Sequence, residues 1–196
     1  MARTPIHRKI KAFIDTETTG LDQNEGEIIE IAIVREYPSG ISDRWSTKVR
    51  PQHIETAEPE ALAVNGYTPE AWEGAPTFDQ IAEQVKHRLT DVICIGHNVA
   101  FDCEFIEAEM RRVGIKVRFY HKIDTVTLAQ EHLVPCGLRS LSFDNIRRFL
   151  GWPLEGRHAA LEDTVDCQRL YHLLDRAGHR QRLYWRLRNW FRSARS

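Results

Sequence analysis

The pattern of apolar and polar positions predicts strands in the first part of the chain. Residues 12–15 form a short apolar run, and "EIIEIAIVRE" (27–36) is rich in the β-branched residues typical of strands. After the turn signal "YPSG" (37–40), residues 41–51 alternate well enough for a third strand. Because the connections are short, we expect an antiparallel meander.

The rest of the chain predicts helices around a further strand. Apolar residues at i, i+4 and i+8 indicate a helix over 78–89, and "VICIGH" (92–97) has the pattern of a buried strand. Other helices are expected over 101–113, 124–133, 142–150 and 161–177, several of them followed directly by glycine. The order of the elements predicts an α/β domain with a mixed sheet.

The composition is that of one globular domain. The chain has 196 residues, of which 42 % are hydrophobic and 28 % charged. No run approaches the ~18 apolar residues of a membrane span, and the N-terminus lacks the apolar segment of a secretory signal. The cysteines are widely spaced with no CxxC pair, so we expect reduced thiols in a cytoplasmic protein; they are Cys94, Cys103, Cys136 and Cys167.

The charge is unevenly distributed. Residues 176–196 contain seven arginines and no acid, whereas the whole chain has a net charge of −1. We therefore divide the chain into a body, 1–178, and a basic amphipathic tail, 179–196. The favoured interpretation is that an apolar face of the tail docks on the body. Alternatively the tail grips nucleic acid with its arginines and aromatic rings, or binds a partner; "QRLYW" (181–185) faintly resembles a sliding-clamp peptide.

The stretch "FIDTETTGL" (13–21) places two carboxylates close together. If this segment is a strand, Asp15 and Glu17 project to the same face. Unpaired neighbouring carboxylates repel each other, and a hard divalent metal ion is the strongest candidate to compensate them.

Two further stretches carry acids near helix starts. "GHNVAFDCEF" (96–105) contains Asp102, and "GRHAALEDTVDC" (156–167) contains His158 and Asp163. Each of these residues alone has an ordinary explanation, such as a favourable position at the positive end of a helix dipole. Together with the first pair they form a set of acids beside strand ends and helix starts, where functional sites form.

These stretches, in this order, resemble the DnaQ-like (DEDDh) 3′–5′ exonucleases over roughly residues 11–177. "EIIEIAIV" and "SLSFDNIRRFLG" (140–151) extend the resemblance. Ala159 stands where a tyrosine subclass has its tyrosine, so the chain is similar to the histidine subclass. The resemblance implies a ribonuclease H-like fold, a general base at His158, and two Mg²⁺ or Mn²⁺ ions held by Asp15, Glu17, Asp102 and Asp163.

The chemistry is consistent with these residues. Two metal ions ~3.5–4 Å apart stabilise the attacking and leaving oxygens of a phosphodiester, and a histidine with a pKa of ~6.5 accepts a proton near neutral pH. The resemblance implies that Asp15 bridges both ions. Glu17 and Asp163 then share the ion that carries the nucleophilic water, and Asp102 serves the other ion.

The resemblance also implies that the turn of residues 18–21 binds the substrate. Its backbone approaches the terminal nucleotide, and Gly20 permits this approach or a positive φ. Leu21 is expected to pack against the terminal base. The loop "VNGYTPE" (64–70) departs from a His-Gly pair found in many relatives. The expected substrate-binding residues are Thr18, Thr19, Gly20, Leu21, Asn65, Tyr67 and Asn98.

Neighbouring polar residues have simpler interpretations. His97 is a weaker candidate for a base than His158, and Glu30 is expected to be structural. Asn98 is as well explained by a capping role as by substrate binding. Glu104, Glu107 and Glu109 are expected to form a solvated helix face.

The function expected is a metal-dependent 3′–5′ exonuclease that releases nucleoside 5′-monophosphates from single-stranded or frayed DNA. Trimming of RNA or short oligonucleotides is an alternative, because exonucleases that act on DNA and on RNA share these motifs. A proofreading subunit inside a polymerase assembly is another. A non-catalytic nucleic-acid-binding relative is disfavoured, because a binding module gains little from four carboxylates facing a polyanion.

Overall fold

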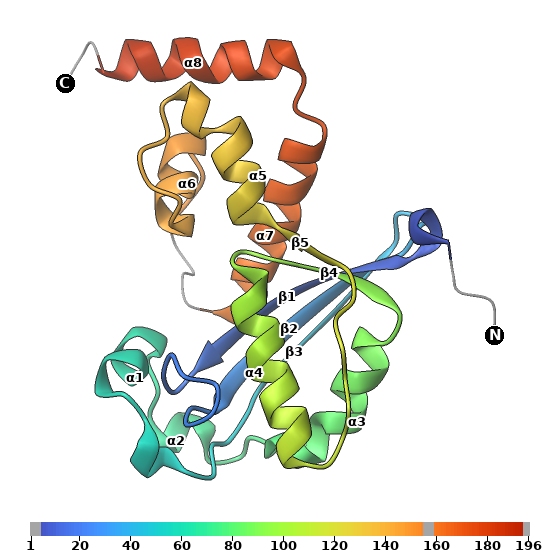
Figure 1. Cartoon of the computed structure of the whole chain (residues 1–196). Coiled ribbons are helices and arrows are strands. Elements are labelled where there is room, and N and C mark those ends of the chain that lie inside the picture. The colour runs from blue at the N-terminus through green and yellow to red at the C-terminus, as the bar shows by residue number, and fades with distance from the viewer. Residues whose placement is uncertain (1–4, 155–158, 194–196) are drawn as a thin grey trace.

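The structure, a computed structural model, describes residues 5–154 and 159–193. Its centre is a five-stranded mixed sheet with the order β3-β2-β1-β4-β5 (Figure 1). The first three strands pair antiparallel, β4 pairs in parallel with β1, and β5 pairs in parallel with β4. The predicted meander and mixed sheet are confirmed. The strands are β1 (Ile10–Thr18), β2 (Ile28–Glu36), β3 (Ser42–Lys48), β4 (Val92–Gly96) and β5 (Lys122–Asp124).

The described part of the chain has eight α-helices, of which α8 packs on other helices and not on the sheet. The five helices predicted between residues 78 and 177 are all present, although α4 begins two residues earlier than expected. The short α1, α2 and β5 were not predicted. The helices are α1 (Pro59–Asn65), α2 (Pro69–Trp72), α3 (Phe78–Leu89), α4 (Val99–Arg112), α5 (Thr125–His132), α6 (Phe143–Leu150), α7 (Ala160–Asp175) and α8 (His179–Ser193).

Strand alternation divides the core between the two faces of the sheet. Ala12 and Ile14 of β1 pack with α3 and α4 on one face. Phe13 packs on the other face with Cys167 and Tyr171 of α7. Because side chains alternate along a strand, Asp15 and Glu17 follow Phe13 toward α7, and Thr16 follows Ile14 toward α4. The two layers of helices therefore meet the end of β1 from opposite sides.

The basic tail forms α8 and docks on the body. Trp185 is 2 % exposed in an apolar cluster with residues of α5, α6 and α7. Arg188 donates hydrogen bonds to the carbonyls of Phe149 and Leu150 at the C-terminus of α6, and Arg186 donates to Pro135. A guanidinium is favourable there because the last carbonyls of a helix lack partners and form its negative end. These contacts agree with the interpretation that the tail docks on the body.

None of the helices in the described ranges combines the length and the apolar character needed to cross a lipid bilayer.

Candidate active site

Three carboxylates meet beyond the end of β4. The parallel pairing of β1 with β4 stops at Phe13, so Asp15 and Glu17 lie on a part of β1 that extends past its neighbour. Asp163 reaches the same place from the first turn of α7. One oxygen from each of the three lies within 4.8 Å of the others, which makes this a group able to hold a metal ion.

The electrostatics of this group call for a cation. Burial raises the pKa of Asp15 well above its ordinary value, and the charges of Asp102 and Asp163 add to the effect. Burial and the charges of Asp163 and Glu30 raise the pKa of Glu17 to about 7. Ionised carboxylates at this place are therefore unfavourable without a compensating charge. The donors are all oxygens, the ligands that Mg²⁺ and Mn²⁺ prefer, so the residues fit a hard divalent ion.

Asp102 occupies a second position beside this group. It is 4 % exposed on α4, and Oδ1 accepts hydrogen bonds from both the amide and the hydroxyl of Thr16, at 2.9 and 2.8 Å. Burial raises the pKa of Asp102 to about 7, against the opposing effect of the Thr16 hydrogen bonds. Its charge acts on Asp15, but it is not in the described group of three whose oxygens lie within 4.8 Å. The four acids thus divide into a cluster of three and one neighbour.

Asp163 has a cationic partner that sequence reasoning missed. Arg147 of α6 has a side chain that is only 4 % exposed, and its guanidinium donates to Oδ1 of Asp163. The same group donates to Asp166, 2.9 Å away. The only trace in the sequence is the arginine pair within "SLSFDNIRRFLG", which gives no indication of partners.

Of the two candidate bases, His158 lies outside the described residues, in the connection between α6 and α7. His97 is described, and both of its ring nitrogens are engaged. Nδ1 lies 3.0 Å from the Thr125 hydroxyl and Nε2 lies 2.8 Å from the Leu141 carbonyl oxygen. Burial lowers the pKa of His97. These contacts give His97 a structural role.

The turn after β1 is fixed by its own polar groups. The Thr18 hydroxyl donates to the Gly20 carbonyl at 2.7 Å. Thr19 is fully buried, and it pairs with Glu27 through its amide and its hydroxyl. Leu21, in contrast, is 75 % exposed, and its amide donates to Glu58. The turn therefore exposes the apolar Leu21 side chain from a backbone that these hydrogen bonds hold in place.

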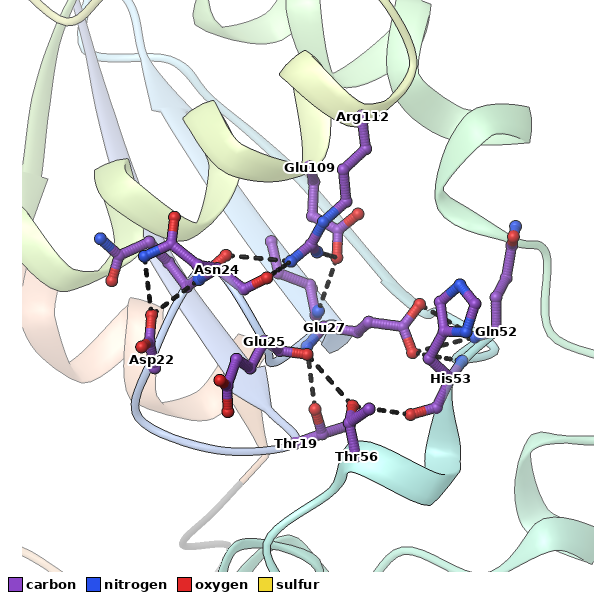
Figure 2. A network of polar contacts seen from close by, with 12 residues as sticks. Thr19, Asp22, Asn24, Glu25, Glu27, Gln52, His53, Thr56, Glu109 and Arg112 are labelled. Atoms are coloured by element: carbon purple, nitrogen blue, oxygen red, sulfur yellow. Dashed lines mark hydrogen bonds and ion pairs between the residues drawn. The ribbon is translucent and has the colours of Figure 1, made fainter.

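A wider network anchors the loop that follows this turn (Figure 2). Glu27 accepts hydrogen bonds from the amides of Gln52 and His53, and Arg112 donates to the carbonyls of residues 23 and 24. Glu109 is 4 % exposed, accepts from the amide of Ile28 at 3.1 Å and pairs with Arg112. The prediction that Glu109 belongs to a solvated helix face is wrong, because the loop folds over this end of α4.

The other expected substrate residues are held by protein contacts. Asn65, at the end of α1, donates through its side chain to the Thr18 carbonyl at 2.9 Å, so it braces the turn. Tyr67 packs on Trp72 with ring centroids 5.0 Å apart. Asn98 occupies the N-cap position of α4 with φ 69°, but its side chain makes no capping hydrogen bond. Asn65 thus adjoins the turn through a role that its sequence context did not indicate.

Glu30 lies on β2 directly opposite Glu17 of β1. Its pKa is raised by burial, against the opposing effect of a hydrogen bond from the Ala160 amide. The contact joins β2 to the first residue of the helix that carries Asp163, which agrees with the structural role expected for Glu30.

Comparison with known proteins identifies the family. The family model described as Exonuclease matches residues 12–171, which include the three described carboxylates and Asp102. The chain belongs to the exonuclease family. The DnaQ-like 3′–5′ exonuclease resemblance is confirmed.

Curated relatives of this exonuclease include proteins named as DNA polymerase III components. It is 29 % identical over 165 residues to the DNA polymerase III subunit epsilon of Treponema pallidum, covering 84 % of this chain and 75 % of the relative. The epsilon subunit of Aquifex aeolicus is 30 % identical over 153 residues, with coverages of 78 % and 73 %. The PolC-type DNA polymerase III of Thermotoga maritima is 32 % identical over 152 residues, which are 77 % of this chain but 11 % of the relative.

Solved structures confirm the fold of this exonuclease. A zinc-bound complex of Escherichia coli exonuclease I with single-stranded DNA matches with a TM-score of 0.75 at 19 % identity. The match covers 90 % of this chain and 42 % of the other, so this chain spans less than half of the exonuclease I length. Cell-death related nuclease 4 matches with a TM-score of 0.68 at 18 % identity, covering 85 % of this chain and 64 % of the other.

Proposed function

We propose that this chain hydrolyses the terminal phosphodiester at the 3′ end of DNA with two divalent metal ions and releases nucleoside 5′-monophosphates. The observation that carries the proposal is the convergence of the Asp15, Glu17 and Asp163 oxygens within 4.8 Å. The raised pKa values of Asp15 and Glu17 support it, because these groups require a cation to be ionised together.

Each residue has a defined part in this proposal. Asp15, Glu17 and Asp163 hold metal. Asp102, which accepts two hydrogen bonds from Thr16, serves the second ion. Bound Mg²⁺ or Mn²⁺ polarises water and offsets the charge that develops on the phosphate oxygens. His158 acts as general base through an imidazole nitrogen that accepts the proton of the attacking water.

The turn after β1 supports recognition of a chain end. Leu21 is 75 % exposed in the turn that follows the strand of Asp15 and Glu17, and we assign it the contact with the terminal base. Thr18, Thr19 and Gly20 shape the backbone beside the nucleotide, and Asn65 supports them from α1. Tyr67 and Asn98 are assigned further contacts with the substrate.

DNA is the favoured substrate on the basis of the relatives. The similar curated proteins are DNA polymerase III components, and exonuclease I has been solved with single-stranded DNA. The alternative is RNA or short oligonucleotides. The names of the relatives also favour a polymerase partner, so a proofreading role within a polymerase or clamp assembly is our second candidate. We place the activity in the cytoplasm, with residues 1–178 as the exonuclease domain and 179–196 as the tail.

The test is a gel assay with 5′-labelled single-stranded DNA and RNA of matched sequence, in Mg²⁺, Mn²⁺ or EDTA. We expect a ladder that shortens from the 3′ end, is lost in EDTA and is lost in Asp15→Asn and His158→Ala. Glu104→Gln changes an exposed acid of α4 and serves as the matched control. An unshortened substrate with folded, metal-loaded protein would contradict the proposal, unless a co-purified polymerase restores activity and supports the second candidate.

A further inference from the structure

Arg147 is a buried cation shared by three carboxylates. Its guanidinium donates to Asp163 and Asp166 of α7, and lies 3.7 Å from a carboxylate oxygen of Asp144 on its own helix. Its face packs on the Phe143 ring, 4.4 Å from the ring centroid. A buried arginine is unfavourable unless it is paired, and here each of its three nitrogens has an acidic neighbour. The side chain is therefore held in one orientation.

One of the three carboxylates belongs to the proposed metal site. Asp163 Oδ1 receives the hydrogen bond from Arg147, and an oxygen of Asp163 lies with those of Asp15 and Glu17. A carboxylate has two oxygens with about four lone-pair sites, so it can accept from an arginine and still bind a metal ion. Asp166 and Asp144 are not in that described group. The guanidinium thus contacts one carboxylate of the proposed metal site and two carboxylates outside it.

We propose that Arg147 is a positioning residue that orients Asp163 for metal binding before the ion arrives. The planar fork of an arginine fixes a carboxylate more strictly than a lysine ammonium does, because its donors have a fixed geometry. The inference rests on the proposed metal-dependent function, and it assigns Arg147 no contact with the substrate.

The same ion pairs join the two helices on either side of His158. Arg147 lies one turn before the end of α6, and Asp163 and Asp166 lie in the first two turns of α7. The connection between these helices carries the proposed base. Arg147 therefore links a metal ligand and both anchor points of that connection through one side chain.

The experiment measures metal binding without substrate or turnover. Mn²⁺ is titrated into the full chain, and free Mn²⁺ is followed by electron paramagnetic resonance. Wild type and Asp15→Asn establish first that the proposed metal site exists. Arg147→Lys keeps the charge but loses the fork, and Arg147→Met removes both.

A second variant background separates an effect on metal binding from a folding defect. Removing Arg147 alone takes its charge away from three partly buried carboxylates, so Arg147→Met is also made in Asp144→Asn/Asp166→Asn. The double variant that retains Arg147 is its matched control. Folding of each variant is checked by circular dichroism.

We expect Mn²⁺ affinity to fall by about 10–100-fold in Arg147→Met in both backgrounds, the range known for groups that orient metal ligands. Arg147→Lys should be intermediate, and the control double variant should bind within about threefold of wild type, because it keeps the Asp163 contact. Unchanged affinity in folded Arg147→Met would overturn the inference and leave Arg147 a structural role. Tighter binding would overturn it too, because the arginine would then compete with the ion. A wild type that binds no Mn²⁺ would refute the metal site itself.

Discussion

Thr16 and Asp102 lie 86 residues apart in the sequence, and two hydrogen bonds to a single oxygen join them. The amide and the hydroxyl of Thr16 both donate to Asp102 Oδ1. Since the pairing of β1 with β4 ends at Phe13, the Thr16 amide lies beyond the paired part of β4 and donates to a carboxylate instead. One side chain thus completes the sheet and supplies the fourth acid.

Thr16→Val should loosen Asp102 while leaving the strand intact. Valine keeps the shape and the strand preference of threonine but removes one of the two donors to Asp102. We expect a loss of about 1 kcal/mol in the free energy of unfolding and a fall in kcat of about tenfold. Urea denaturation and the gel assay measure the two effects. Thr47→Val on β3 is the control, and an equal effect there would refute a specific role for Thr16.

Metal removal should change how stability depends on pH. Glu17 and Asp102 have folded-state pKa values of about 7, above the values of ordinary carboxylic acids. An acid with a raised folded-state pKa favours folding at low pH, and this contribution is lost as the pH rises through the folded-state pKa. In EDTA, Tm should therefore fall by several degrees between about pH 5 and about pH 8.

Divalent ions should reverse this dependence. They bind the ionised form, so Mg²⁺ or Mn²⁺ should raise Tm more at the upper end of the range than at the lower. Differential scanning fluorimetry in both buffers measures it. Glu17→Gln should flatten the EDTA profile; a profile that stays unchanged in this variant would show that other groups cause the dependence.

Glu36 should give the opposite dependence, at acidic pH and far from the site. It joins β2 to α7 by accepting from Gln168 and contacting His172, at 2.8 and 2.6 Å, and it pairs with Lys11. Burial alone would raise the pKa of Glu36, but hydrogen bonds from His172, Gln168 and Lys11 outweigh it, and the pKa is lowered. Its stabilisation is present above the unfolded-state pKa and is lost as the pH falls through the folded-state value.

Glu36→Gln should therefore cost about 1–2 kcal/mol at neutral pH and weaken the loss of stability in acid. Urea denaturation across the acidic range measures both. Glu83→Gln, at the exposed ion pair with Lys86, is the control and should cost less than about 0.5 kcal/mol. Parallel acid profiles of wild type and Glu36→Gln would contradict the assignment.

Gly20→Ala should weaken binding of the chain end rather than the fold. A Cβ at residue 20 would lie 2.8 Å from Glu58 Oε1, the oxygen that accepts from the Leu21 amide. Glu58 is flexible and can move aside, but Leu21 then loses that support. We expect KM for a DNA oligonucleotide to rise several-fold with kcat and Tm little changed. A fall in kcat at unchanged KM would indicate that the turn serves the chemistry instead.

Much of this architecture could be predicted because it is encoded locally. Strand alternation is enough to bring Asp15 and Glu17 to one face, and Gly151 ends α6 in the left-handed region, with φ 76°. The motif order indicated Asp163 and Asp102. The glycine at position 20 is explained by the nearby Glu58 side chain and not by a positive φ.

What the sequence did not predict depends on tertiary contacts. α2 has four residues and β5 has three, too few for a periodic pattern. Glu109 has the spacing of a surface acid, and it is buried because residues 22–26 fold over it. Arg147 acquires its partners only when α6 and α7 come together. Its charge is visible in the sequence, but its pairing is not.

The order of strands gives the two halves of the site different dynamics. Asp15 and Glu17 lie on β1, the central strand, whereas Asp163 lies in the first turn of a helix. Central strands usually exchange their amide hydrogens only on global unfolding, and helix ends open locally. Hydrogen exchange should therefore be slow along β1 and faster at the start of α7. The carboxylates on β1 would then be fixed, whereas the one on α7 could move. A bound ion would slow exchange mainly at the start of α7.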